Sequence, residues 1–361
     1  MKRIRTEDAV GHVLCHDMTQ IIPGQFKGPR FHKGHVVQPE DIPVLLSMGK
    51  EQLYVWEMTP GALHENDAAE RLCALAINAN MDRGEPKEGK IELTAAMDGL
   101  FLVDSARLIA VNSQEEVMIA TRHGNTPVRK GDKLAGMRVI PLVIAEETLR
   151  KAEEAAGDKP LLALLPYVKK TAAIIATGSE VKKGLIQDSF TPVVKRKLQT
   201  YGIETLSVAY PGDAVEDIAA AIAQARETGA DLILCTGGMS VDPDDNTPGA
   251  IRRSGADIVT YGAPVLPGAM FLLGYYEDGT AVCGLPGCVM YAGATVFDLV
   301  LPRLAAGVRV ERKDLIALGE GGLCLSCPEC HYPICPFGKW KFPPWPLSGA
   351  KLFPIVILER G

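Results

Sequence analysis

Three glycine-containing loops carry the residues of this chain that are best suited to hold an anion. They are Thr177-Gly178-Ser179-Glu180, the stretch from Thr236-Gly237-Gly238 to Asp245, and Gly284-Leu285-Pro286-Gly287. Glycine lets backbone N–H groups approach an anion without interference from a Cβ atom. A strand-to-helix turn uses the same residues without binding anything. Because three such loops occur in one part of the chain, we predict that together they hold a phosphate group.

Carboxylates add a second kind of chemistry to these loops. They are Glu180, Asp188, Asp242, Asp244 and Asp245. Mg²⁺ needs only one or two carboxylates when water and substrate phosphate oxygens complete its octahedral shell. A solvated acidic loop is the alternative for residues 242–245. Asp213 is expected to cap the helix that follows it, and the seven histidines form no Ser/His/Asp or HExxH pattern.

Four of the nine cysteines lie close together near the C-terminal end, as Cys324, Cys327, Cys330 and Cys335. Their C-x₂-C-x₂-C-x₄-C spacing is one residue longer than the bacterial iron–sulfur pattern, in which the last cysteine also precedes a proline. Four thiolates also suit tetrahedral zinc, although zinc sites commonly use paired knuckles. Exposed free thiols would be reactive. We therefore predict one bound metal, and the sequence leaves zinc and an iron–sulfur cluster open.

The elements that position the three loops alternate as strand, loop and helix from about residue 168. Expected strands cover 172–176, 203–208 and 231–235, and expected helices cover 189–201 and the stretch after Asp213. This order predicts parallel strands joined by crossover helices, with ligands bound beyond the carboxyl ends of the strands. Residues 168–310 should therefore form a doubly wound, mostly parallel, three-layer α/β domain.

The residues before this domain predict a smaller, β-rich α+β region. Residues 1–90 read as a mixed α/β lobe with helices over 41–49 and about 62–80. Residues 91–160 read as a small barrel or sheet with strands over 100–103, 108–111, 117–120 and 139–144, followed by a linker helix. Residues 320–340 form the Cys-rich segment. Four other cysteines occupy apolar runs and should be buried: Cys15, Cys73, Cys235 and Cys283.

Composition excludes several classes of protein. The chain has 361 residues, enough for two or three domains. Its formal net charge is −6 and its longest basic block is Lys195-Arg196-Lys197, which argues against nucleic-acid binding. The N-terminal residues are charged and no apolar run approaches ~20 residues, so we expect neither export nor a membrane span. Together with the cysteine distribution, this predicts a cytoplasmic location.

Residues 168–306 resemble the molybdopterin-binding domain shared by molybdopterin molybdotransferases, including the gephyrin type, and by MoaB/Mog-like adenylyltransferases. Order and spacing agree at the following stretches: Thr177 to Val181, Gly184 to Ser189, Gly237 to Val241 with Asp245, Pro267-Gly268, Gly284 to Gly287, and Leu301-Pro302. The agreement extends over about 140 residues. It is more specific than any one glycine motif.

The resemblance implies a role for each matching residue. Glu180 and Asp245 would act in catalysis beside molybdate, and the Mg²⁺ ligands would come from Asp188, Asp242 and Asp245. Molybdopterin itself would contact the following loop residues: Thr177, Gly178, Ser179, Gly237, Gly238, Ser240, Pro286 and Gly287.

Departures from the family pattern concern mainly the cations. The insertases carry two lysines around a Pro-Gly, whereas this chain has Leu266-Pro267-Gly268-Ala269. Cys288-Val289 replaces Asn-Pro, Asp242 replaces a glycine, and Ser179 replaces an aspartate. Only Met97-Asp98-Gly99-Leu100 echoes the stretch that supplies a catalytic aspartate. Binding of the pterin is therefore better supported than catalysis of metal insertion.

The resemblance implies a molybdopterin-binding protein of molybdenum cofactor biosynthesis, a transferase that inserts molybdate with the help of Mg²⁺. The alternative is a non-catalytic carrier or sensor whose cysteine segment binds a metal. A nucleotide pyrophosphatase of the competence-damage-inducible type shares the domain, but the Pro-Gly and Leu-Pro-Gly stretches argue against it. Expected partners are molybdopterin, molybdate, a molybdoenzyme or another cofactor-biosynthesis protein, and a second copy of the chain in a homodimer.

Overall fold

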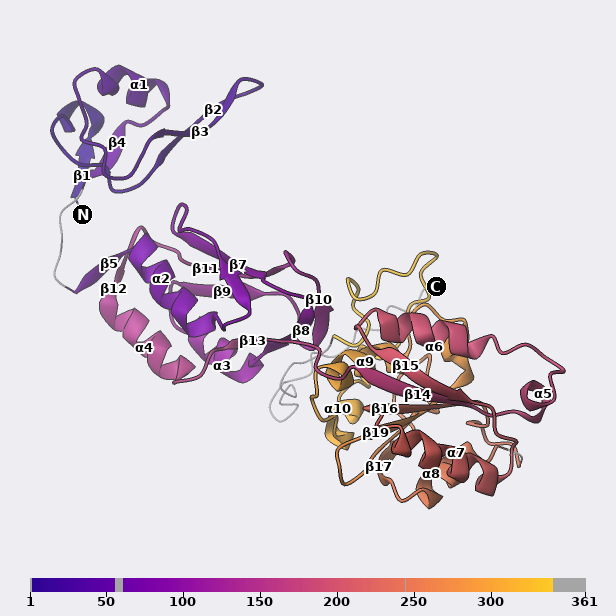
Figure 1. Ribbon diagram of the computed structural model, residues 1–361. Coiled ribbons are helices and arrows are strands. Elements are labelled where there is room, and N and C mark those ends of the chain that lie inside the picture. Colours follow the sequence, from indigo (N-terminus) through magenta and orange to yellow (C-terminus); the bar gives the residue numbers. More distant parts are fainter. Residues whose placement is uncertain (1, 56–60, 244, 340–361) are drawn as a thin grey trace, which may run out of the picture. The chain divides into compact units, whose positions relative to one another are not determined.

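The computed structural model describes residues 2–55, 61–243 and 245–339. The chain divides into two compact units, which are coloured along the sequence in Figure 1. Residues up to Lys169, with Ala305–Val308, form the N-terminal unit; Lys170–Leu304 and the residues from Arg309 onwards form the α/β unit. Each unit is described by itself.

The α/β unit is built on a six-stranded mixed sheet in the order β15-β14-β16-β19-β18-β17. Four strands are parallel: β14 (Thr171–Ala176), β15 (Glu204–Ala209), β16 (Leu232–Thr236) and β19 (Ala281–Leu285). The antiparallel strands are β17 (Asp257–Tyr261) and β18 (Leu272–Tyr275). The central strands are continuous apolar runs because both faces of the sheet are covered.

Helices cover both faces of this sheet, as Figure 1 shows, with α7 and α8 on one side and α6 and α9 on the other. The helical elements are α5 (Ser179–Lys182), α6 (Phe190–Gln199), α7 (Val215–Glu227), α8 (Thr247–Arg253), η2 (Gly287–Met290), α9 (Val296–Ala305) and α10 (Arg312–Ile316). Apolar side chains of α7 and α8 pack on β14, β16 and β19 to form one core. The unit is therefore an α/β domain.

A largely buried ion pair joins α6 to α9. The Lys197 ammonium lies 2.5 Å from the Asp298 carboxylate, and the two side chains are 15% and 12% exposed. The other carboxylate oxygen of Asp298 accepts hydrogen bonds from the amide and hydroxyl of Thr295, at 2.8 and 3.1 Å. The Asp298 carboxylate therefore accepts hydrogen bonds at the start of α9 and neutralises Lys197 of α6.

The N-terminal unit consists of small antiparallel sheets and four α-helices in the described residues. The sheets have the orders β1-β4, β2-β3, β12-β5, β6-β7-β11-β9 and β10-β8-β13. The strands are β1 (Lys2–Arg5), β2 (Met18–Ile22), β3 (Phe26–Phe31), β4 (Gln52–Val55), β5 (Ala62–His64), β6 (Met81–Arg83), β7 (Lys90–Ala95), β8 (Gly99–Val103), β9 (Val117–Thr121), β10 (Thr126–Val128), β11 (Lys133–Val139), β12 (Val143–Ala145) and β13 (Leu162–Leu165). The helices are the 3₁₀ turn η1 (Thr6–Asp8), α1 (Asp41–Ser47), α2 (Glu65–Ala76), α3 (Ser105–Asn112) and α4 (Glu146–Ala156).

The strand predicted over residues 108–111 is wrong, because these residues lie in helix α3. The Asp104 carboxylate accepts a hydrogen bond from the Arg107 amide at 3.1 Å and caps the helix. Leu108 and Val111, three residues apart, then face the same core. The apolar run over residues 108–111 is compatible with a strand or a helix, and the hydrogen bond from the Arg107 amide to Asp104 stabilises the helix.

The cysteine segment packs on the α/β unit after α10. The amide of Leu266 donates to the Gly322 carbonyl and the amide of Cys324 donates to the Leu266 carbonyl, both at 2.8 Å. Further along, the Tyr332 hydroxyl donates to the Asp298 carbonyl at 2.8 Å, and Phe337 is buried. None of the helices in the described ranges combines the length and apolar character needed to cross a membrane.

Candidate functional site

The three predicted loops leave the sheet at one edge. Ala176 pairs with Thr236, and Thr236 pairs with Leu285, so the loops that follow these strand ends are neighbours. The Thr177 amide and hydroxyl both donate to the Thr236 carbonyl, at 2.8 and 3.1 Å. The structure therefore brings the first and second loops into direct contact at the carboxyl ends of the parallel strands, where α/β domains bind ligands.

Two consecutive glycines shape the second loop. Gly237 and Gly238 have φ values of +83° and +56°, in the left-handed region. A Cβ atom on Gly237 would lie 2.5 Å from the Thr177 carbonyl oxygen, and one on Gly238 would lie 2.8 Å from Thr247 Oγ1. Neither backbone amide has a hydrogen-bond acceptor among the described residues. The loop therefore offers two adjacent N–H groups that could donate hydrogen bonds to an anion.

Asp213 links the first two loops, a role that the sequence analysis missed. Helix α7 begins at Val215 with Ala214 at its N-cap, so the expected cap by Asp213 is wrong. The Asp213 carboxylate instead accepts a hydrogen bond from the Ser179 amide at 2.9 Å. The Asp213 carbonyl accepts another from the Asn246 side chain, also at 2.9 Å. Nothing local in the sequence indicates these contacts.

Asp245 and Ser240 are bound to each other. The Asp245 carboxylate accepts a hydrogen bond from the Ser240 amide at 2.8 Å, which closes the loop between them. The Ser240 amide is therefore engaged within the loop, whereas its side chain is exposed. Beneath them, Tyr261 donates its hydroxyl to the Met239 carbonyl at 3.1 Å, and buried Met239 packs against Gly284 of the third loop.

The other predicted loop residues lie around this centre. Glu180 is exposed in the first turn of α5, with its carboxylate over Gly178. Asp242 is exposed, and Asp244 lies outside the described residues. In the third loop Pro286 is buried and Gly287 is exposed at the start of η2. The exposed carboxylates at this edge are thus accessible to a ligand.

Asp188, a predicted Mg²⁺ ligand, has one oxygen engaged at the start of α6 and a second, buried oxygen without a hydrogen-bond partner among the described residues. One of its carboxylate oxygens accepts hydrogen bonds from the amides of Phe190 and Thr191, at 2.8 and 3.0 Å, at the start of α6. Burial raises the pKa of this carboxyl, but the hydrogen bonds from Thr191 and Phe190 outweigh burial and lower its pKa below the ordinary value. We assign Asp188 to capping α6.

We expect Asp188→Ala to lower the free energy of unfolding by about 1 kcal/mol at neutral pH, the usual effect of losing a helix cap. A carboxyl with a lowered folded-state pKa stabilises above its unfolded-state pKa of about 3.9, and this stabilisation disappears as the pH falls through the folded-state value. Urea titrations of both proteins between pH 7 and pH 3 check this. A difference that stays constant across this range would contradict the assignment.

The four clustered cysteines are not gathered around a common point. Cys327 and Cys330 are exposed, and Cys324 and Cys335 are partly buried. Within the described ranges, no three His, Cys, Asp or Glu side chains lie close enough together to hold a metal ion. The other prediction about cysteines is confirmed: Cys15, Cys73, Cys235 and Cys283 are buried.

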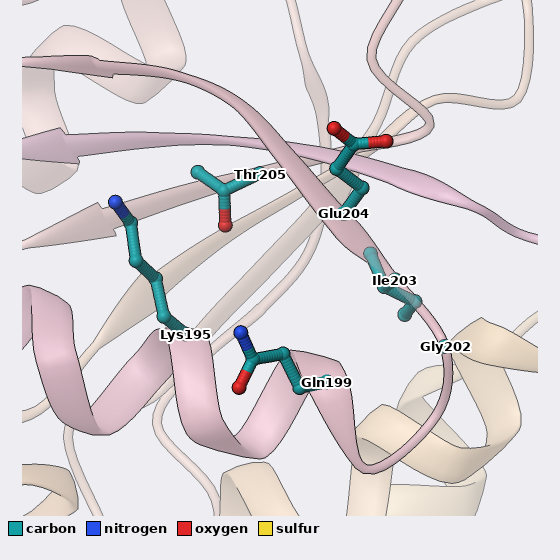
Figure 2. A pocket seen from close by; sticks show the side chains of 6 residues that line it. All are labelled: Lys195, Gln199, Gly202, Ile203, Glu204 and Thr205. Carbon is teal, nitrogen blue, oxygen red and sulfur yellow. The ribbon is translucent and has the colours of Figure 1, made fainter.

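A hollow of about 420 Å³ lies at the other edge of the sheet. Figure 2 shows Lys195 and Gln199 of α6 on one side of it and Thr205 of β15 on the other. Glu204, at the start of β15, pairs with Thr171 at the start of β14. No predicted site residue lines this hollow, so we do not assign it to the candidate site.

Comparisons with known proteins match two separate parts of the chain. A family described as a probable molybdopterin-binding domain matches residues 173–306, and a domain of unknown function matches residues 3–57. The molybdopterin molybdenumtransferase of Synechococcus elongatus is 26% identical over 216 residues, which cover 57% of this chain and 51% of that protein. A CinA-like protein of Mycobacterium avium is 34% identical over 86 residues, covering 24% of this chain and 20% of that protein.

Among solved structures, the molybdopterin biosynthesis enzyme MoaB from Thermus thermophilus is 21% identical, with a TM-score of 0.31. The match covers 38% of this chain and 97% of that one. The chain thus spans about half the length of the first curated relative and a fifth of the second.

Proposed function

Because residues 173–306 belong to the family of molybdopterin-binding domains, we propose that the loop edge of the α/β unit binds molybdopterin. One observation carries this assignment to these particular loops: the Gly237-Gly238 turn, held against Thr177, presents two amides without an acceptor among the described residues. These N–H groups would receive the phosphate of the pterin. Glycine is needed at both positions because a side chain would collide with Thr177 of the first loop at position 237 and with Thr247 of α8 at position 238.

We propose further that the bound pterin receives molybdate, a step of molybdenum cofactor biosynthesis. This step demands mainly positioning and electrostatics from the protein. Molybdate and the pterin phosphate are both anions, so their approach beside carboxylates is opposed by like-charge repulsion. Leu266 and Ala269 stand where insertases carry lysines, and Leu266 is 56% exposed. The missing positive charge must come from another source.

Mg²⁺ would supply that charge when bound, since it tolerates one or two carboxylates with water and substrate oxygens. Glu180 in the first loop and Asp242 and Asp245 in the second are the carboxylates of the two loops that meet at the glycine turn, and they would hold it. Asp188 would reach the ion only through its second oxygen, because the first one caps α6. The described residues hold no cluster of three His, Cys, Asp or Glu side chains. This is compatible with an ion whose coordination shell is completed by substrate oxygens and water.

The test is conversion of molybdopterin to active cofactor by molybdate, with and without Mg²⁺. We expect Mg²⁺-dependent turnover that falls at least tenfold in Glu180→Gln and in Asp245→Asn. Glu204→Gln is the matched control, because it removes an exposed carboxylate at the opposite edge of the same sheet. Equal losses in all three variants would contradict a specific role for the loop carboxylates.

A carrier or sensor is the second candidate function, and the missing lysines favour it. Tight molybdopterin binding without turnover at any Mg²⁺ concentration would select this function over insertion. The finer expectations from the sequence remain proposals: a homodimer, a molybdoenzyme or biosynthetic protein as partner, and a cytoplasmic location.

We also propose that Cys324, Cys327, Cys330 and Cys335 bind one zinc ion or iron–sulfur cluster. The support is their spacing and their accessibility, since none of the four is buried. Anaerobic purification followed by metal and sulfide analysis should give about one site per chain. Cys327→Ser should lose the metal, whereas Cys288→Ser, a partly buried thiol outside the segment, should keep it. Metal-free protein with four alkylatable thiols in the segment would refute the proposal.

A further inference from the structure

A hollow of about 310 Å³ lies between helix α6 and the turn that follows η2. Arg196 and Lys197 line it from α6, Met290 lines it from the end of η2, and Tyr291 and Gly293 line it from the turn. It lies on the flank of α6, and none of its lining residues belongs to the three loops of the candidate site. No acidic residue occurs among the described residues that form its wall. The hollow is therefore a concave, basic surface that the proposed function does not use.

The charge in this hollow comes from one arginine. The Lys197 ammonium is neutralised by Asp298, 2.5 Å away. The Arg196 guanidinium has no ion-pair or hydrogen-bond partner among the described residues. A guanidinium presents several N–H donors in a planar fork that matches the oxygens of a phosphate group. Arg196 is therefore free to bind a phosphorylated ligand.

An exposed aromatic side chain stands on the opposite wall. Tyr291 is 78% exposed, and its neighbour Met290 is 38% exposed. An aromatic ring at the wall of a hollow offers a flat surface on which another ring can stack. Small-molecule sites commonly combine such an apolar surface with a few polar groups that fix orientation.

We propose that this hollow binds a small aryl phosphate, with the phosphate on Arg196 and the ring against Tyr291. This proposal goes beyond the molybdopterin assignment, because it uses other residues on another part of the unit. Each of the two proposals can fail without the other.

Cys330 provides a local reporter for the site. A Cβ atom on Gly293 would lie 2.8 Å from the Cβ and 2.9 Å from the Sγ of Cys330, so the thiol lies beside the wall of the hollow. Cys330 is exposed, as is Cys327 three residues before it. A ligand in the hollow should shield Cys330 from alkylation and leave Cys327 reactive.

The experiment uses the full-length protein, freed of metal by a chelator, with phenyl phosphate as the probe. Alkylation of each cysteine is followed by mass spectrometry, and affinity is measured by calorimetry. We expect at least a several-fold slower reaction at Cys330 and no change at Cys327. Arg196→Gln should weaken binding by roughly 10–100-fold, because it removes a charged hydrogen-bond donor. Lys195→Gln is the matched control, since it removes the same charge from the adjacent residue, which lines the hollow of Figure 2.

Tyr291→Ala should weaken binding of phenyl phosphate but leave that of inorganic phosphate unchanged. Equal weakening by Arg196→Gln and Lys195→Gln would overturn the proposal, because it would indicate only a general effect of charge. Binding that survives Arg196→Gln but is lost in Gly237→Ala would also overturn it, because the probe would then occupy the glycine turn.

Discussion

Replacing Asp298 by alanine is expected to lower the free energy of unfolding by about 3–5 kcal/mol, the usual cost of breaking a buried ion pair from one side. The variant leaves the Lys197 ammonium, only 15% exposed, without its partner. It also leaves the amide and hydroxyl of Thr295 without their acceptor. Urea denaturation followed by circular dichroism measures the loss.

Lys195→Met is the control for this prediction, because Lys195 carries the same charge on the same helix and lines a surface hollow. It should change stability by less than about 0.5 kcal/mol, as surface substitutions usually do. Lys197→Met should be milder than Asp298→Ala, since Asp298 keeps its hydrogen bonds from Thr295. A loss below 1 kcal/mol in Asp298→Ala would contradict the view that this pair joins α6 to α9.

Gly237→Ala is expected to weaken molybdopterin binding at least tenfold. The new Cβ atom would lie 2.5 Å from the Thr177 carbonyl oxygen, a distance that forces the first and second loops apart. Both amides proposed to receive the phosphate belong to the second loop, which Thr177 of the first loop holds in place, so separating the loops displaces the site. Left-handed backbone adds a strain of about 1–2 kcal/mol for a residue with a side chain. Binding is measured through the fluorescence of the pterin.

Gly229→Ala separates the steric effect from backbone strain. Gly229 has φ +71°, close to the +83° of Gly237, but a Cβ atom there would meet nothing within 4 Å. This control should lose a similar amount of stability from strain and bind molybdopterin normally. If both variants bound the pterin equally well, the glycine turn would not be the phosphate site.

The α/β unit was predictable because its elements follow from short patterns in the sequence. The buried runs at β14 and β16 and the amphipathic faces of α6 and α7 occur within windows of about 15 residues. Parallel connection then brings the ends of the strands, and hence the three loops, to one edge. The capping role of Asp188 was not predicted, because its carboxylate was interpreted as a Mg²⁺ ligand, and the structure shows it at the start of α6.

The sequence by itself determined which loops lie at the carboxyl ends of the parallel strands and which residue types they carry, because local patterns and parallel topology suffice for that. Only the tertiary structure decided how the side chains are engaged. Asp213 binds the Ser179 amide across 34 residues of sequence, and Lys197 binds Asp298 across 101. From the sequence alone, Asp188 and Asp213 both precede a helix and could both cap it, but only Asp188 does so in the structure. The actual partner of such a carboxylate depends on which distant donor the fold brings within 3 Å, and no local pattern contains that information.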